Sequence, residues 1–399
     1  MKISLFILLS LQSYYFYEVG VALFPLVSFL IIVLLLTIRC REDILKIQTK
    51  ATVHTLLFYF LLFLWSLLGL IYLNEVFNLK RLVGFTLVII ATLYAEKFFK
   101  NISTFKLIKT YLTIHLCFFY IQIILYYSTG IFLDYITHIT GETQRVLSVS
   151  FDHPVFGHLI RPSGLFIEPG TYATFIAPFV ALFSKWRGRT RKSSFIFWCG
   201  LISLFISSSV FGILFGLIIL ISLKSISLKF KIISLTPLVA YIAPYMYYRF
   251  IHKIQFGGDN GIGIREGRFI NAGEYIFTNA NGFLFGIKNL LSLNPHTPYI
   301  MSDNDVGLLF YLTTSIGVFP SIFLVFLLFI MLKRVGYEAK ISLLLVLLSK
   351  HSIFTLFFPF MIVLILSNHR RPHEMPVYKK PMNVSGSSTE FNQPKLKST

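Results

Sequence analysis

Long apolar runs separated by short polar segments dominate the chain. A helix that crosses a bilayer needs about 20 mostly apolar residues. This pattern predicts five single spans: Ala51–Leu73, Leu82–Ala95, Tyr111–Thr129, Leu165–Ser184 and Ile232–Tyr248.

Four further apolar runs are longer than one ordinary span or are interrupted. Three of them are expected to form pairs of helices: Ile3–Ile38, broken at Glu18; Ser194–Ser222, broken at Ser207; and Ile341–Ser367, broken at Lys350. The fourth, Val306–Leu332, is expected to form one long, tilted helix. The pattern therefore predicts an all-α fold with about 12 transmembrane helices in a single domain over residues 1–368.

Composition favours the same class of protein. Hydrophobic residues make up 55% of the chain and charged residues only 13%, and the mean hydropathy is +0.73. Soluble proteins carry about 25% charged residues. The chain has too little polar surface to cover a water-soluble globule, so we expect a polytopic membrane protein.

The net charge of +19 suggests nucleic-acid binding at first sight, but the placement of the basic residues argues against it. They lie in short clusters between apolar runs, such as Lys185–Lys192. Basic clusters favour the cytoplasmic side of a membrane. This placement predicts that both termini are cytoplasmic. Residues 369–399 are rich in Pro, Ser and Lys, so we expect them to form a disordered cytoplasmic tail whose basic residues favour anionic lipid headgroups.

Two predicted external connections are long, at residues 130–160 and 249–305, so any chemistry is expected on the external side. The first leads into a segment, Arg161–Gly170, that holds two prolines, two glycines and Glu168. A helix from Thr171 to Ser184 would be about 21 Å long, shorter than the ~30 Å hydrocarbon core.

This shortfall predicts that the helix begins below the outer interface, with Glu168 near its N-cap. Irregular backbone at such a depth survives only where protein or a cavity surrounds it, and a carboxylate there is a functional-site candidate. The alternative is a proline-kinked helix in which Glu168 pairs with Arg161 and merely caps the helix.

The second external loop carries arginines on both sides of a glycine-rich stretch. Arg249 precedes residues 257–263, and Arg265 and Arg268 follow them with a spacing that places both on one face of a helix. Two arginines on one face can bind a diphosphate through forked hydrogen bonds. An ordinary solvated basic loop is the alternative.

The loop ends in two acids, Asp303 and Asp305, at the predicted start of a helix. A carboxylate is favoured there by the helix dipole, so capping explains either acid. An Asp-x-Asp pair can also hold a metal, but the histidines show no ligand spacing and the cysteines form no CxxC pattern. We therefore expect no metal and no cofactor.

These features resemble the oligosaccharide repeat-unit polymerases, the Wzy-type O-antigen polymerases, which belong with the O-antigen ligases among GT-C-like membrane glycosyltransferases. The matching stretches are Arg161-x-x-Gly164-x-Phe166-x-Glu168-Pro169 and the break Ser207-Ser-Ser-x-x-Gly212. A large late loop with arginines follows, ending in Asp303-Asn-Asp305-x-Gly307, with Gly317 inside the next helix.

The resemblance implies a reaction on the periplasmic face of the bacterial inner membrane. A growing glycan on undecaprenyl diphosphate would be transferred to a sugar hydroxyl of an incoming lipid-linked unit, as in O-antigen, lipopolysaccharide or capsule-type polysaccharide biosynthesis. Arg161, Arg265 and Arg268, and less strongly Arg249, would bind the diphosphate. Glu168, Asp305 or Asp303 would act in catalysis by activating the acceptor. A chain-length regulator and a flippase would be possible partners, and no nucleic acid is expected.

Two other functions stay open at this stage. The sister ligases carry a histidine at the start of the helix after the large loop, where this chain has Asp303-Asn304-Asp305. A lipid-linked oligosaccharide flippase would also have about 12 spans, but such transporters commonly show internally repeated halves, and none is visible here.

Overall fold

The computed structural model describes part of the chain. The described residues are 50–73, 82, 85–86, 88–90, 92, 103–137, 143–144, 151–153, 157–224, 226–247, 270, 272–286, 307–333, 335–349 and 357–367. The predicted helix pair in Ile3–Ile38 lies outside them. The chain divides into two units, Met1–His369 and Arg370–Thr399, and the second, which holds most of the predicted tail, also lies outside the described residues.

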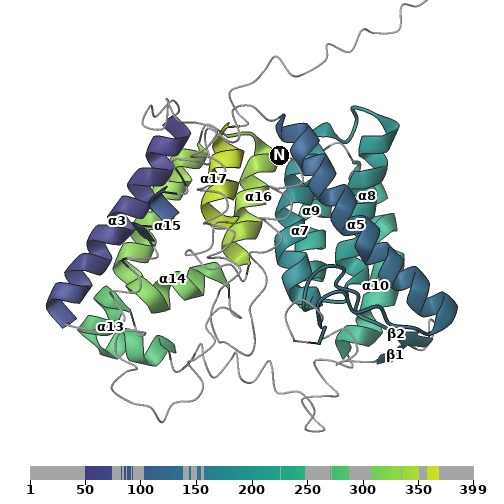
Figure 1. Cartoon of the computed structure of the whole chain (residues 1–399), viewed down its shortest axis with the longest axis horizontal. Helices are drawn as coiled ribbons and strands as arrows, with labels where there is room; N and C mark the ends of the chain where they lie inside the picture. The colour runs from purple at the N-terminus through teal and green to yellow at the C-terminus, as the bar shows by residue number, and fades with distance from the viewer. Residues whose placement is uncertain are drawn as a thin grey trace, which may run out of the picture. The chain divides into compact units, whose positions relative to one another are not determined.

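The described part is mostly helical, as predicted (Figure 1). Its helices are α3 (Lys50–Leu73), α5 (Thr104–Thr129), α7 (Pro169–Phe183), α8 (Arg191–Ile206), α9 (Val210–Ser222), α10 (Leu228–Tyr247), α13 (Ala280–Phe285), α14 (Leu308–Ile316), α15 (Val318–Leu332), α16 (Tyr337–Leu348) and α17 (Phe357–Ser367). A short 3-10 turn, η1 (Ser184–Trp186), follows α7.

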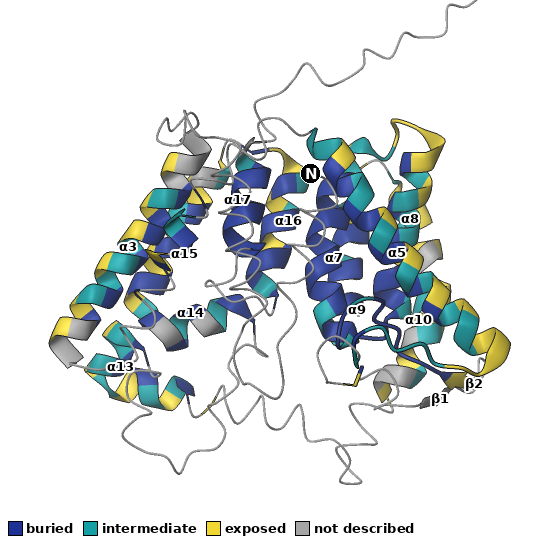
Figure 2. Cartoon of the chain, in the orientation of Figure 1, coloured by how far each residue is buried: buried dark blue, intermediate teal, exposed yellow. Residues whose placement is uncertain are grey.

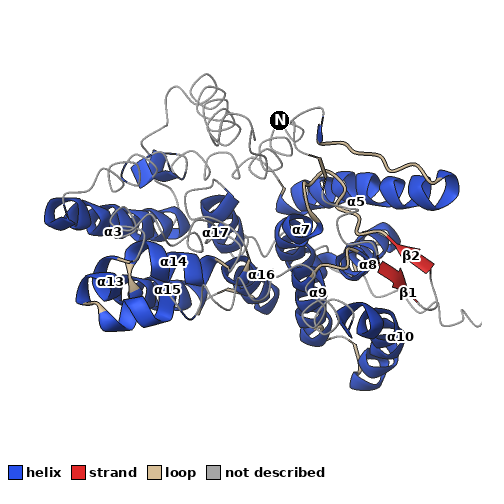
Figure 3. Cartoon of the chain, turned by 90° about the horizontal axis from the view of Figure 1, so that it is seen from below, coloured by secondary structure: helices blue, strands red, loops and turns tan. Residues whose placement is uncertain are grey.

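A small hairpin interrupts the first predicted external loop. Strand β1 (Phe151–His153) pairs antiparallel with β2 (Gly157–Leu159), with Asp152 opposite His158 (Figure 3). The chain then passes directly into the segment before α7. The loop predicted over residues 130–160 therefore contains ordered structure close to the candidate site.

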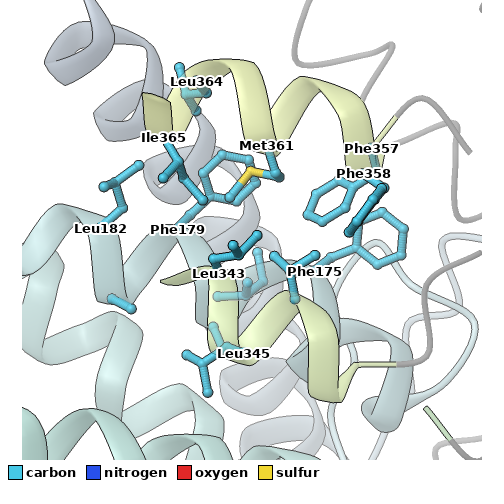
Figure 4. Packing of buried hydrophobic residues seen from close by; sticks show 14 of the residues in the cluster. Phe175, Phe179, Leu182, Leu343, Leu345, Phe357, Phe358, Met361, Leu364 and Ile365 are labelled. Carbon is cyan, nitrogen blue, oxygen red and sulfur yellow. The ribbon is translucent and has the colours of Figure 1, made fainter. Parts of the chain in front are cut away.

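Helix α7 follows the predicted site segment and is buried along nearly its whole length, and Figure 2 shows it almost entirely in the colour of buried residues. It packs against α5, α8, α9 and α16. Aromatic rings fill the contact with α17: Phe357 lies 4.6 Å from Phe175 and 5.9 Å from Phe179, between ring centroids (Figure 4). A helix covered on so many sides gives a rigid base for the residues at its start.

The predicted break at Ser207–Ser209 is confirmed, because α8 ends at Ile206 and α9 begins at Val210. Ser208 adopts a φ of 49°, and the Ser209 side chain caps α9 by accepting a hydrogen bond from the Gly212 amide. A Cβ at Gly212 would collide with the Leu204 carbonyl oxygen. The serines and the glycine together allow the two helices to turn back tightly on each other.

The prediction of one long helix over Val306–Leu332 is wrong. The chain breaks at Gly317, where φ is 95°, a value that disfavours any residue with a Cβ. The carbonyl oxygens of Phe283 and Leu284, at the end of α13, lie where a Cβ at position 317 would be. The indole Nε1 of Trp65 donates to the carbonyl oxygens of Leu284 and Ile316, both at 3.1 Å. Tertiary contacts from α3 and α13 therefore set the break, which apolar periodicity alone does not reveal.

Of the helices that the structure describes, α5 is long and apolar enough to cross a membrane, by length and composition. Shorter apolar stretches lie at Thr55–Gly69, Val210–Ser222, Val318–Ile330 and Phe357–Leu366. The core helix of a soluble protein passes the same test as α5. The described residues thus establish a helical fold but not the predicted set of about 12 spans.

Candidate functional site

The segment between β2 and α7, residues 160–168, is an irregular strip buried inside the protein. Arg161 is 8% exposed, Ser163 and Phe166 are fully buried, and Gly164 takes a φ of 56°. Within the strip the Phe166 amide donates to the Ser163 carbonyl oxygen at 3.1 Å, and side chains bond to several of the other main-chain groups. The strip is therefore held by the surrounding protein and not by a helix or sheet of its own.

Gln122, a fully buried residue on α5, clamps one side of the strip. Its Oε1 accepts hydrogen bonds from the amides of Ser163 at 3.0 Å and Gly164 at 3.1 Å. Its Nε2 donates to the Leu133 carbonyl oxygen at 2.9 Å and to Oε1 of Gln144 at 3.0 Å. One side chain thus satisfies two buried amides of the strip and links them to the loop after α5.

Gln144 clamps the strip from the loop side. Its Nε2 donates to the carbonyl oxygens of Gly164 at 2.7 Å and Phe166 at 2.8 Å. The Ser163 hydroxyl also donates to the Phe166 carbonyl oxygen, at 2.7 Å. Because buried backbone groups are costly to leave unbonded, the two glutamines make this irregular path stable at depth.

Asp134 in turn holds Gln144 in place. Its carboxylate accepts from the amides of Ile136, Thr137 and Gln144 at 2.8 to 2.9 Å, and from the Thr137 hydroxyl at 2.6 Å. Burial raises the pKa of Asp134, but the hydrogen bonds from Thr137, Gln144 and Ile136 outweigh it, so the pKa lies below its usual value. The ionised carboxylate organises the loop around Gln144.

This lowered pKa predicts that the loop loosens in acid. A carboxylate with a depressed folded-state pKa contributes stability above its unfolded pKa, near 3.9, and loses it as the pH falls through the folded value. We expect hydrogen exchange at the amides of Ile136 and Gln144 to lose protection progressively as the pH falls below about 4. The Asp134→Asn variant is the control and should show no such transition; equal pH dependence in both proteins would contradict the prediction.

The predicted place of Glu168 near the N-cap of α7 is confirmed, but the helix begins at Pro169 and not at the predicted Thr171. Pro169 occupies the first helical turn, where no amide donor is needed, and Glu168 is the N-cap residue with an extended backbone. The Glu168 side chain makes no capping bond to the helix backbone, and its Oε1 accepts from the Thr171 hydroxyl at 3.2 Å. The carboxylate is half-buried and lies at the positive end of the helix dipole.

Aromatic packing fixes the strip against α5 and α7. The Phe166 ring stacks on His115 with a centroid distance of 4.9 Å and lies 5.4 Å from Phe175. Phe119 stacks on Tyr172 at 4.5 Å, and its backbone would lie 3.3 Å from a Cβ at position 164. Gly164 is therefore required both by its positive φ and by the close approach of α5.

The structure places two of the predicted site residues, Arg161 and Glu168, at the two ends of this strip. The other five lie outside the described residues: Arg249, Arg265, Arg268, Asp303 and Asp305. No group of three or more His, Cys, Asp or Glu side chains that could hold a metal occurs among the described residues. The predicted gathering of three arginines around a diphosphate stays a prediction.

Sequence reasoning missed the residues that position the strip. Gln122 carried a usable signal, because it is a lone amide inside the apolar run Tyr111–Thr129. Gln144 and Asp134 carried none, since each lies in a polar loop where such residues are common. Their roles appear only once the loop is folded against α5.

Comparisons with known proteins give no further guide to the site. No family model, no curated protein and no solved structure matches this chain. Function is therefore inferred from the strip, its clamps and the sequence features around them.

The glutamine clamp predicts a stability effect. Gln122→Leu leaves the buried amides of Ser163 and Gly164 without their acceptor, at about 1–3 kcal/mol for each unsatisfied group. We expect a clear drop in the unfolding temperature of the protein in detergent. Gln122→Glu keeps the acceptor oxygens but loses the amide donor. Its unfolding temperature should lie between those of the native protein and Gln122→Leu.

Thr113→Val serves as the matched control on the same helix, because Thr113 is exposed and its hydroxyl donates to the Lys109 carbonyl oxygen within α5. It should unfold at nearly the native temperature. If Gln122→Leu unfolds like Thr113→Val, the clamp contributes nothing measurable and the description of the strip is wrong.

Proposed function

We propose that this chain is a polytopic bacterial inner-membrane glycosyltransferase that polymerises undecaprenyl-diphosphate-linked oligosaccharide repeat units on the periplasmic face. The observation that carries the proposal is the buried strip between Arg161 and Glu168. A guanidinium and a carboxylate are held at its two ends, directly before a deeply buried helix.

Exposed apolar faces support the membrane location. On α15, four large side chains that recur at helical spacing are 55–64% exposed: Phe319, Ile322, Phe326 and Phe329. On α3, Leu68 and Ile71 are 53% and 72% exposed. Contiguous apolar surface of this kind is rare on soluble monomers and is typical of contact with lipid.

The chemistry follows from the charges on the leaving and attacking groups. The bond between the anomeric carbon and the diphosphate oxygen breaks, and its electron pair stays on the undecaprenyl diphosphate. Arg161, with Arg265 and Arg268, would stabilise the growing negative charge in a water-poor site. The acceptor hydroxyl oxygen forms the new bond to the anomeric carbon, and its proton would pass to Glu168 or Asp305.

The clamped geometry of the strip fits this role. Electrostatic stabilisation is most effective when the charged groups are already in position, because no reorganisation is needed during the reaction. Gln122 and Gln144 fix the backbone immediately after Arg161. The strip is thus preorganised by residues that need not touch the substrate.

The direct test is reconstitution of the purified protein with a purified lipid-linked repeat unit. The proposal expects polymer and free undecaprenyl diphosphate without added protein or metal. Transfer of a preformed glycan to lipid A core without polymerisation would instead favour a ligase. Movement of intact units across the bilayer without bond formation would favour a flippase.

A further inference from the structure

A second surface lies where α5 begins and α7 turns through η1 into α8. It holds seven cationic side chains: Lys106, Lys109, Lys185, Arg187, Arg189, Arg191 and Lys192. We refer to these seven residues as the basic surface. Neither of the two segments that form it, residues 103–109 and 184–192, contains an acidic residue.

Aromatic rings join the two segments. The Phe105 ring, at the start of α5, stacks on Phe183 at 5.8 Å with an interplanar angle of 7°. It also meets the Trp186 ring edge-on at 5.7 Å. The start of α5 and the end of α7 therefore form one continuous surface, which is consistent with the packing of α5 against both α7 and α8.

Two guanidinium groups of the basic surface lie over aromatic rings. The Arg189 guanidinium lies 4.7 Å from the Phe105 centroid, and that of Arg187 lies 5.6 Å from Phe197 and 5.7 Å from Trp198. Cation–π contacts hold a charged group in place without neutralising it, since the ring carries no net charge. These ring contacts therefore position the two guanidinium groups without cancelling their charge.

Two helix starts add to the positive potential. Helix α5 is capped by Ser103 and helix α8 by Thr190, whose hydroxyl oxygen accepts from the Ser193 amide at 3.0 Å. Both helices thus direct their N-terminal, positive ends toward the segments that carry the seven cations.

Exposed apolar side chains lie farther along the same helices. On α8, Phe195 and Ile202 are 70% and 47% exposed, and on α5, Ile121 and Ile124 are 44% and 63% exposed. A nucleic acid or an acidic protein would match the charge but not this apolar continuation. A phospholipid matches both, with its phosphate at the cations and its acyl chains along the helices.

We propose that the basic surface binds the phosphodiester headgroups of anionic phospholipids. The inference rests on the membrane location in the proposed function but not on the glycosyl-transfer chemistry. Each Lys or Arg near an anionic bilayer surface adds to the attraction, so the effect of several replacements should be large.

The test uses the full-length protein purified in detergent and two probes, phosphatidylglycerol and phosphatidylcholine, with bound lipid measured by native mass spectrometry. The variant Arg189→Gln/Arg191→Gln/Lys192→Gln removes three exposed cations. Lys229→Gln/Lys333→Gln/Lys340→Gln is the matched control, because it removes three exposed cations elsewhere on the described helices and their ends. Unfolding temperatures of both variants establish that they are folded.

We expect the native protein and the control to retain phosphatidylglycerol over phosphatidylcholine, and the basic-surface variant to lose at least tenfold in phosphatidylglycerol retention. Equal retention of the two lipids by the native protein would overturn the proposal. So would an equal loss in both variants, or preferential binding of RNA that phosphatidylglycerol does not displace. Lipid retention is measured without a glycan substrate. Its result therefore does not depend on whether the protein is a polymerase.

Discussion

Replacing Arg161 with alanine is expected to abolish long polysaccharide chains. Arg161 is nearly fully buried, and in the proposed reaction its guanidinium stabilises the departing diphosphate. Loss of one preorganised group that stabilises transition-state charge costs on the order of 10²–10³ in rate. The length distribution of surface polysaccharide, resolved on a gel, would shift to single repeat units.

Two companion variants make this result interpretable. Arg161→Lys keeps the charge but loses the forked donor geometry, so it should give short chains and an intermediate rate. Lys340→Ala removes an exposed cation on α16 and should leave the ladder unchanged. Native-length ladders from Arg161→Ala, in cells where the variant is inserted at normal levels, would refute the role of Arg161.

Replacing Gly317 with valine is expected to prevent correct folding. Gly317 has a φ of 95°, and a Cβ there would collide with the Leu284 carbonyl group and the Phe283 carbonyl oxygen at the end of α13. Positive φ is strongly unfavourable for a β-branched residue, and the colliding atoms belong to the backbone, which cannot turn aside as a side chain can. We expect little folded protein after detergent extraction.

Gly273→Ala is the matched control, because Gly273 is helical and a Cβ there would meet nothing within 4 Å. Replacing glycine with alanine inside a helix is stabilising by roughly 0.5–1 kcal/mol. Size-exclusion profiles should therefore show a folded Gly273→Ala protein and an aggregated or degraded Gly317→Val protein. A folded Gly317→Val protein would mean that the break between α14 and α15 is not required.

Local sequence signals were sufficient for the turn between α8 and α9, and they placed the start of α7 to within two residues. Pro169 favours a helix start because it lacks the amide donor that the first turn does not need, and Ser207–Ser209 interrupt an apolar run that would otherwise continue. In both places the residues that decide the backbone are neighbours in sequence. Such features can be predicted without knowing what packs against them.

Other features depend on partners that are distant in sequence. The break at Gly317 is set by Leu284 and Trp65, and a glycine in an apolar run is equally compatible with a continuous helix. Gln122 and Gln144 become a clamp only when the loop folds back on α5. Arg265 and Asp305 lie outside the described residues, so their predicted approach to Arg161 remains a prediction.

The indole of Trp65, bonded to two carbonyl oxygens beside Gly317, gives the protein a built-in optical probe. The chain has three tryptophans, and the other two, Trp186 and Trp198, lie in or beside the basic surface. A Trp186→Phe/Trp198→Phe protein would emit from Trp65 alone and so report on the junction of α3, α13 and α14. The complementary Trp65→Phe protein would emit only from the region that contacts lipid in our proposal, so fluorescence can follow each region separately.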